Sequence, residues 1–264
     1  MSSSSLFYEQ EGVAHLVLQR AATRNAFDGE MIAQLHEHFC QLQNDPHVRL
    51  LVLRAQGEHF SAGADLHWMR ASLHLDAQAN RDDARRLSDM LSALYAIPCP
   101  VLALVQGAAM GGALGMIAAC DLVIAEEQSR FALSELRLGL APAIIAPYVL
   151  RAVGPRIMTQ LTLGAGVFDA QRALAYGLVH ELSPAAAMPA RLQKQIDSIL
   201  QTAPAASRAA KALLRRLHPG PNEDERRLCI DTLAQLRTAQ EAQQGMQAFL
   251  EKRQPAWSPS CANS

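Results

Sequence analysis

The stretch from Val101 to Cys120 limits the possible folds more than any other part of the chain. Gln106 is its only strongly polar residue, and three of its glycines stand four residues apart. A run of this length is sufficient for a membrane helix. However, Pro100 precedes it, Asp121 follows it, and no Lys or Arg stands near either end to set an orientation in a bilayer. The stretch therefore predicts two buried elements with a turn between them, and no membrane span.

Composition favours one packed domain without a nucleic-acid partner. Half of the 264 residues are hydrophobic, 19% are charged, and the formal net charge is −1. Binding to nucleic acid requires a concentrated basic surface, which this balance does not indicate. The length fits a core of about 200–250 residues with a short extra element. We expect a core over residues 1–203 and a C-terminal helical portion over residues 204–264.

The cysteines and the first residues predict a cytoplasmic protein. The five cysteines are widely spaced and form no CxxC pair, as is usual for free thiols in a reducing compartment. The opening MSSSSLFYEQEG has neither the basic residues nor the apolar segment of a signal peptide. The nine histidines show no spacing that joins two of them to a plausible third ligand, so we predict no metal.

Apolar periodicity predicts an α/β fold with a helical C-terminal portion. Short apolar runs indicate strands at 13–19, 48–53 and 101–106, and helical spacing follows at 28–44 and 76–96. Most of the chain after residue 142 has helical spacing. Strands that alternate with helices early in a chain, followed by helices, are typical of an α/β core with added helices.

Small residues crowd the loop after the second predicted strand. The segment Phe60-Ser-Ala-Gly-Ala64-Asp-Leu66 lies where a strand ends and a helix begins. Small side chains let a ligand approach the backbone, and amides at a helix start carry partial positive charge. The segment indicates either a site for a polar oxygen or an ordinary tight turn.

The end of the third predicted strand has the same character. Gln106 is followed by Gly-Ala-Ala-Met-Gly111-Gly112-Ala-Leu-Gly115, whose glycines free amides at the start of a buried helix. One glycine cluster is weak evidence by itself and also fits close helix packing. Two such loops, each after a buried strand, predict one amide each for a shared oxyanion hole.

Glu135 interrupts the apolar segment 131–140. Partial burial of its carboxyl group would raise the pKa and suit the group to general acid/base catalysis. The alternative is a surface Glu paired with Arg130 or Arg137. The residues alone leave both interpretations open.

Taken together, these three elements resemble the crotonase (enoyl-CoA hydratase/isomerase) superfamily, and the resemblance covers nearly the whole chain. It begins at Arg20-Ala-Ala-Thr-Arg-Asn-Ala-Phe27, similar to the family's RP..NA segment, and ends at Gly245–Pro255, similar to its EG..AF..KR.P segment. FSAGADL and GAAMGGALG, in this order, are highly specific in combination. The resemblance implies a spiral of ββα units, assembled as a homotrimer or a dimer of trimers, with C-terminal helices that pack on a neighbouring copy.

The resemblance also implies the residues of the site. The amides of Ala64 and Gly112 match the oxyanion-hole positions, and Glu135 matches one of the family's two acid/base positions. Coenzyme A would enter as part of an acyl-CoA thioester substrate, so no separate cofactor is expected. The residues implied to lie along coenzyme A are Arg24, Ala62, Asp65, Leu66, Gly111, Phe249 and Lys252.

The sequence departs from the best-known hydratases at Gly115, where those enzymes carry a second Glu. A finer similarity to bacterial 3-methylglutaconyl-CoA and isohexenylglutaconyl-CoA hydratases, which have Gly at this position, keeps hydration as the expected reaction. Such substrates arise in leucine and acyclic terpene catabolism. A single-Glu enoyl-CoA isomerase and a non-catalytic acyl-CoA-binding paralogue are the alternatives.

The acyl group would need an apolar pocket and a partner for its free carboxylate. Apolar residues near the site favour the longer isohexenyl chain, although Met69, Leu140, Ile144 and Ile145 fit a protein core equally well. Candidates for the carboxylate are His67, Arg70 and Arg137, although such side chains are more often solvated. Asp65 and Asp121 have the sequence context of capping or loop-bracing residues rather than of acids.

Overall fold

A largely parallel sheet forms the centre of the protein. The structure is a computed structural model that describes residues 4–8 and 12–258. Within these residues the larger sheet has the strand order β1-β2-β3-β4-β6-β9, and only the β1–β2 pair is antiparallel. Its strands are β1 (Ser4–Tyr8), β2 (Val13–Leu18), β3 (Leu50–Ala55), β4 (Val101–Val105), β6 (Leu122–Glu126) and β9 (Glu181–Ser183).

A second, smaller sheet produces the spiral. It contains β5 (Ala108–Met110), β7 (Arg130–Ala132) and β8 (Val167–Asp169) in this order. The chain passes from β4 to β5 and from β6 to β7, so each turn places one strand in each sheet before the next helix. This arrangement is the α/β spiral of ββα units expected from the sequence.

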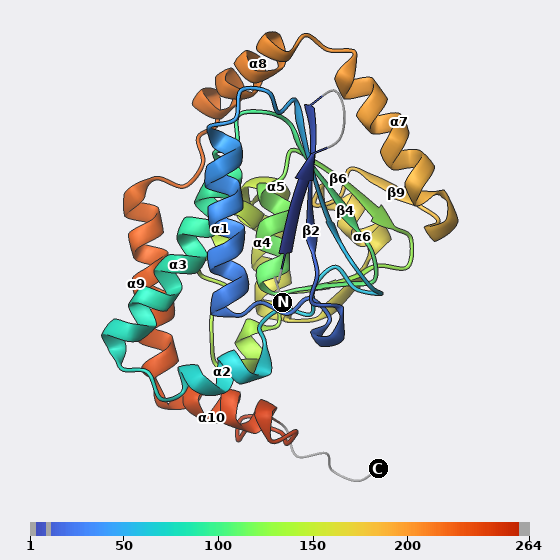
Figure 1. Ribbon diagram of the computed structural model, residues 1–264. Coiled ribbons are helices and arrows are strands. Elements are labelled where there is room, and N and C mark those ends of the chain that lie inside the picture. The colour runs from blue at the N-terminus through green and yellow to red at the C-terminus, as the bar shows by residue number, and fades with distance from the viewer. Residues whose placement is uncertain (1–3, 9–11, 259–264) are drawn as a thin grey trace.

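Helices cover both faces of the larger sheet (Figure 1). Alternate strand residues point to opposite faces, so Ala14 and Leu16 pack in the main core while Val13 packs against α7. The helices of the first 200 residues are α1 (Gly29–Gln43), α2 (Leu66–Ser72), α3 (Ala77–Tyr95), α4 (Gly112–Ala119), α5 (Ala146–Gly164), α6 (Ala170–Ala175) and α7 (Met188–Leu200). Helix α5 consists of two helical segments, because Gly154, whose φ of 77° and ψ of 164° are not helical, separates them at a kink before Pro155.

The apolar stretch 101–120 folds as buried elements, as predicted. It contains β4, the short strand β5 that the sequence did not reveal, and α4, which is buried nearly all round. Among the described residues, no helix combines the length and the hydropathy needed to cross a membrane. Of the predicted free thiols, Cys40, Cys99, Cys120 and Cys229 are free, and Cys261 lies outside the described residues.

Three C-terminal helices complete the chain: α8 (Pro204–Leu217), α9 (Glu223–Thr238) and α10 (Gln240–Leu250). Helix α9 packs along α3, and α10 packs against α2 and the short 3-10 helix η3 (Glu135–Leu138) of the same chain. Further 3-10 helices in the described part of the chain include η2 (Ala21–Thr23) and η4 (Ala185–Ala187). Packing of these helices on a neighbouring copy stays a prediction, as does the division at residue 203.

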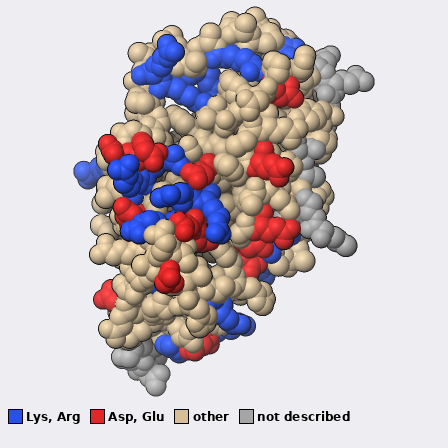
Figure 2. All heavy atoms as spheres, turned by 60° about the vertical axis from the view of Figure 1, so that its left-hand side comes forward, with Lys and Arg blue, Asp and Glu red and all other residues tan. Residues whose placement is uncertain are grey.

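Figure 2 shows positive and negative side chains interleaved on the face that α3 and α9 form. Two ion pairs join these helices at the surface, Arg81 with Asp231 at 2.7 Å and Arg226 with Asp89, and a third pair, Arg237 with Asp83, is buried. Exposed pairs of this kind contribute about 0–1 kcal/mol each. They set the register of α9 on α3 more than they stabilise the fold.

Candidate active site

A cavity of about 430 Å³ lies among the two small-residue loops, η3 and α10. Parallel strands end at the same sheet edge, so the loops after β3 and β4 meet there. Ser61 and Ala109 form an isolated parallel bridge, and Met110 N donates to Ser61 O at 3.0 Å. The residues that line the cavity include Phe27, Ala64, Trp68, Leu87, Gly112, Glu135, Arg137, Leu140, Ile144, Ile145, Leu233, Arg237 and Phe249.

Two of the residues that line this cavity have a backbone amide without a partner among the described residues. The neighbouring amides of Gly111 and Asp65 donate to backbone carbonyls at 2.9 and 2.8 Å. Within residues 4–8 and 12–258, the amides of Ala64 and Gly112 make no hydrogen bond, and both residues line the cavity. Gly112 is the first residue of α4, where an amide has no helical acceptor. The shared oxyanion hole predicted from the sequence requires two amides that are free in this way.

Gly111 brings Glu135 close to these amides. Its φ of 53° favours glycine, and a Cβ at this position would stand 3.2 Å from Glu135 Oε1. The carboxyl group therefore lies against the loop that starts α4. A side chain at residue 111 would be strained and would crowd the acid.

Glu135 is a buried acid rather than a surface ion pair. Burial raises the pKa of its carboxyl group to about 7. Oε2 is buried and, among the described residues, has no hydrogen-bond partner. No ion pair in this part of the chain joins Glu135 to Arg130 or Arg137, so the structure supports the acid/base interpretation over the surface one.

The position of the missing second Glu is filled by packing. A Cβ on Gly115 would stand 2.4 Å from Ile145 Cγ2 and 3.2 Å from Leu91 Cδ1. The first distance is far inside van der Waals contact. Ile145 therefore occupies the space that a second carboxylate would need. The lack of a side chain at Gly115 is what allows Ile145 to pack there.

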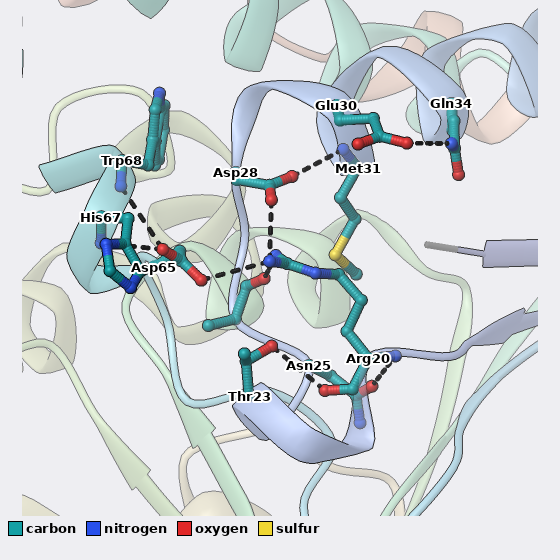
Figure 3. Close-up of polar contacts among 11 residues, drawn as sticks. Arg20, Thr23, Asn25, Asp28, Glu30, Met31, Gln34, Asp65, His67 and Trp68 are labelled. Carbon is teal, nitrogen blue, oxygen red and sulfur yellow. Dashed lines mark hydrogen bonds and ion pairs between the residues drawn. The ribbon is translucent and has the colours of Figure 1, made fainter. Parts of the chain in front are cut away.

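The segment around Arg20 holds the first loop in place (Figure 3). Arg20 Nη2 lies 2.8 Å from Asp28 Oδ2 and 3.2 Å from Asp65 Oδ2. Asp65 Oδ1 accepts from the amides of His67 and Trp68 and so caps α2. This is the capping role that the sequence indicated. The ion pairs and the cap connect the Arg20 segment to the loop that carries Ala64.

Replacing Asp65 should test this connection. Asp65→Ala removes the cap and the ion pair, and should lower the free energy of unfolding by about 1–2 kcal/mol. Asp65→Asn keeps an acceptor for the cap and should cost less. Urea unfolding of both variants measures the difference. Equal losses would show that the ion pair with Arg20, rather than the cap, stabilises the loop.

The predicted site residues divide into two groups. Those that line the cavity are Ala62, Ala64, Gly111, Gly112, Glu135 and Phe249. Arg24, Asp65, Leu66 and Lys252 do not line it, and Leu66 is 54% exposed. Contact of either group with coenzyme A stays a prediction. Of the carboxylate candidates, Arg137 lines the cavity, whereas His67 and Arg70 are exposed outside it.

Sequence reasoning missed Arg237, which lines the cavity and is 8% exposed. A signal was available, because Arg237 follows the apolar residues Ile230 and Leu233 by seven and four positions. Those spacings place it on the buried stripe of α9. Within the part of the chain that the structure describes, no group of His, Cys, Asp and Glu is placed to hold a metal ion.

Comparisons with known proteins agree with this geometry. The sequence profile of the enoyl-CoA hydratase/isomerase family matches residues 8–260. A 2,3-dehydroadipyl-CoA hydratase of Escherichia coli is 28% identical over 96% of this chain and 98% of its own. The structure of an enoyl-CoA hydratase from Shewanella pealeana is 39% identical, with a TM-score of 0.79 over 97% of this chain and 96% of that one.

The fold is shared more closely still with an enoyl-CoA hydratase from Mycobacterium avium subsp. paratuberculosis. That structure has a TM-score of 0.86 at 25% identity and covers 97% of this chain and 98% of its own. The predicted α/β crotonase fold is thereby confirmed. The chain belongs to the enoyl-CoA hydratase/isomerase (crotonase) family, and the enzyme class predicted for it, a hydro-lyase of the enoyl-CoA hydratase type, is confirmed with that membership.

Proposed function

We propose that the protein adds water to a 3-substituted glutaconyl-CoA, with isohexenylglutaconyl-CoA favoured and 3-methylglutaconyl-CoA next. The observation that carries the proposal is the buried carboxyl group of Glu135, which lies beside two unpartnered amides in one cavity. These are the groups needed to polarise a thioester and to move a proton at its α-carbon. Such a substrate would place the enzyme in acyclic terpene or leucine catabolism, in the cytoplasm.

The amides of Ala64 and Gly112 would hold the thioester oxygen. This oxygen gains negative charge as water adds at the β-carbon, so hydrogen bonds to it strengthen in the transition state. One such donor is worth about 3–4 kcal/mol. Both donors belong to backbone fixed by neighbouring hydrogen bonds, so they need no rearrangement. The β-carbon thereby becomes more electrophilic.

Glu135 would perform both proton steps. In its protonated form it gives a proton to the α-carbon, and its other oxygen accepts a proton from the attacking water. The C–O bond forms at the β-carbon, the α-carbon gains hydrogen, and Glu135 ends protonated as it began. A pKa of about 7 keeps much of this acid protonated at neutral pH.

We therefore expect the rate of hydration to fall as the pH rises, because the protonated form of Glu135 is the active one. We expect kcat/KM for hydration to be constant below pH about 7 and to fall about tenfold per pH unit above it. Since hydration releases no net proton, dehydration of the product should show the same dependence. Initial rates between pH 5 and pH 9 provide the measurement. A rate that rises through pH 7 would assign the active form to the carboxylate instead.

The cavity fits a branched acyl group. Its size lies in the range typical of small-molecule sites, and its wall includes Trp68, Leu140, Ile144 and Leu233. These apolar side chains remove hydrocarbon surface from water when an acyl chain binds. They support the longer isohexenyl substrate over the methyl one, because a short branch would leave part of the wall uncovered.

Gly115 favours one second candidate, an enoyl-CoA isomerase that uses Glu135 alone. Incubation with 3-methylglutaconyl-CoA and isohexenylglutaconyl-CoA in oxygen-18 water separates the two. Heavy oxygen in the product supports hydration, and double-bond migration without incorporation would refute it. Tight binding of both esters without any turnover would indicate a non-catalytic binding protein.

We also propose assembly as a homotrimer or a dimer of trimers. Helix α8 supports this, because Leu213, Leu214 and Leu217 are 57%, 65% and 73% exposed on it. Such a row of leucines is unfavourable in water and suits a subunit contact. Light scattering after size-exclusion chromatography measures the mass, and a monomer at micromolar concentration would contradict the proposal.

A further inference from the structure

Arg237 is a buried cation at the cavity wall that the proposed mechanism does not use. It lies in the last turn of α9, next to Trp68 of α2 and Leu87 of α3 in the cavity lining. Burial costs a guanidinium its hydration, so a buried Arg is rare without a partner. A guanidinium at this position therefore requires an anionic partner.

Asp83 of α3 orients this guanidinium. Arg237 Nη1 donates to Asp83 Oδ2 at 2.6 Å, and Trp68 Nε1 donates to Asp83 Oδ1 at 3.2 Å. The guanidinium carbon also lies 5.6 Å from the centroid of the Trp68 ring. Each oxygen of Asp83 is engaged, so Arg237 is held from one side in a defined position.

The guanidinium retains donors that the protein does not use. A guanidinium carries five N–H groups, and across residues 4–8 and 12–258 it makes one hydrogen bond, to Asp83. Arg86 Nη1 lies 3.9 Å from Asp83 Oδ1, so two cations meet one anion here. Free N–H donors with a positive local charge suit a carboxylate ligand, which a guanidinium binds with two parallel hydrogen bonds.

Arg237 lies away from α4, on the side of the cavity that would receive the acyl group. Asp83, Leu87 and Leu91 follow one another at four-residue intervals on one face of α3. Leu91 packs near Gly115 of α4, Leu87 lines the cavity, and Asp83 lies about 12 Å along the helix from Leu91. Arg237 therefore stands beyond an apolar wall, away from the helix that supplies the oxyanion amide.

We infer that Arg237 binds the distal carboxylate of a dicarboxylic acyl-CoA substrate and thereby selects against esters that end in a methyl group. The inference rests on the proposed function and names the residue that would recognise the second charge of its substrate. Arg137 and Arg253 also line the cavity, but both are exposed, and water competes there for their donors. The buried and preoriented Arg237 is the better ligand.

Binding of unreactive saturated esters tests the inference independently of catalysis. Titration calorimetry would compare 3-methylglutaryl-CoA, which has the distal carboxylate, with isovaleryl-CoA, which lacks it. Arg237→Gln should weaken binding of the first by 10- to 100-fold and that of the second by less than threefold. Arg237→Lys should restore part of the preference. If both esters lose affinity equally, Arg237 serves packing and the inference is wrong.

Three further variants keep the test decisive. Arg237→Gln leaves Asp83 buried without its cation, so the double variant Asp83→Asn, Arg237→Gln removes both charges and should show the same loss of preference. Arg86→Gln and Arg137→Gln are the matched controls, and a loss in either one alone would move the assignment to that residue. Wild-type protein that prefers the dicarboxylic ester but hydrates no enoyl-CoA would uphold Arg237 while refuting the proposed function.

Discussion

Glu135→Gln should lower kcat for hydration by about 10²- to 10⁴-fold while affinity for CoA esters changes little. The amide has the size of the acid but neither gives a proton to carbon nor accepts one from water. The side chain is buried and Oε2 has no protein partner among the described residues, so the variant should fold. Stopped-flow loss of enoyl absorbance measures the rate, and calorimetry measures the affinity.

The control for this variant is Glu127→Gln, which changes an exposed Glu outside the cavity. Its rate should equal that of the wild-type protein. Hydration by Glu135→Gln within threefold of wild type would show that another group supplies the proton. A large loss of affinity together with the rate would show that Glu135 shapes the cavity, since a group that acts only in the transition state lowers kcat alone.

Gly115→Glu should not create a hydratase with two acids. Its Cβ alone would overlap Ile145, and overpacking of this kind costs about 1–3 kcal/mol. Burial of an unpartnered carboxyl group adds further destabilisation. Because Gly115 lies one turn into α4, displacement of this helix would also move the amide of Gly112, so we expect kcat to fall about 100-fold. Urea unfolding and initial rates provide both measurements.

We expect this loss for Gly115→Glu because residue 115 has no space for a side chain, and not because the position needs the conformational freedom of glycine. Gly29→Ala is the matched control, since a Cβ there would meet no atom within 4 Å, and it should leave stability nearly unchanged. In a double-mutant cycle, Gly115→Ala and Ile145→Ala should couple, with the pair less destabilised than the sum of the single variants. A folded and faster Gly115→Glu enzyme would show that Ile145 moves aside.

The two loops at the proposed thioester end of the site could be predicted because their sequence signals are contiguous. The loops that contain Ala64 and Gly112 are each readable as a buried strand, small residues and a helix start within about ten positions. Parallel strands then bring the two loops to one sheet edge without further information. The short strand β5 was missed, because three residues show no usable periodicity.

By itself, the amino-acid sequence determined the family and the α/β spiral, and it indicated the two amides and the acid that we propose for the site. Tertiary structure decided what surrounds them. Only packing shows that Glu135 is buried without an ion pair and that Ile145 fills the space beside Gly115. Arg237 and Asp83 stand 154 positions apart and meet only because α9 packs on α3. Contacts between distant segments depend on how helices and sheets pack, and local sequence patterns do not predict that packing.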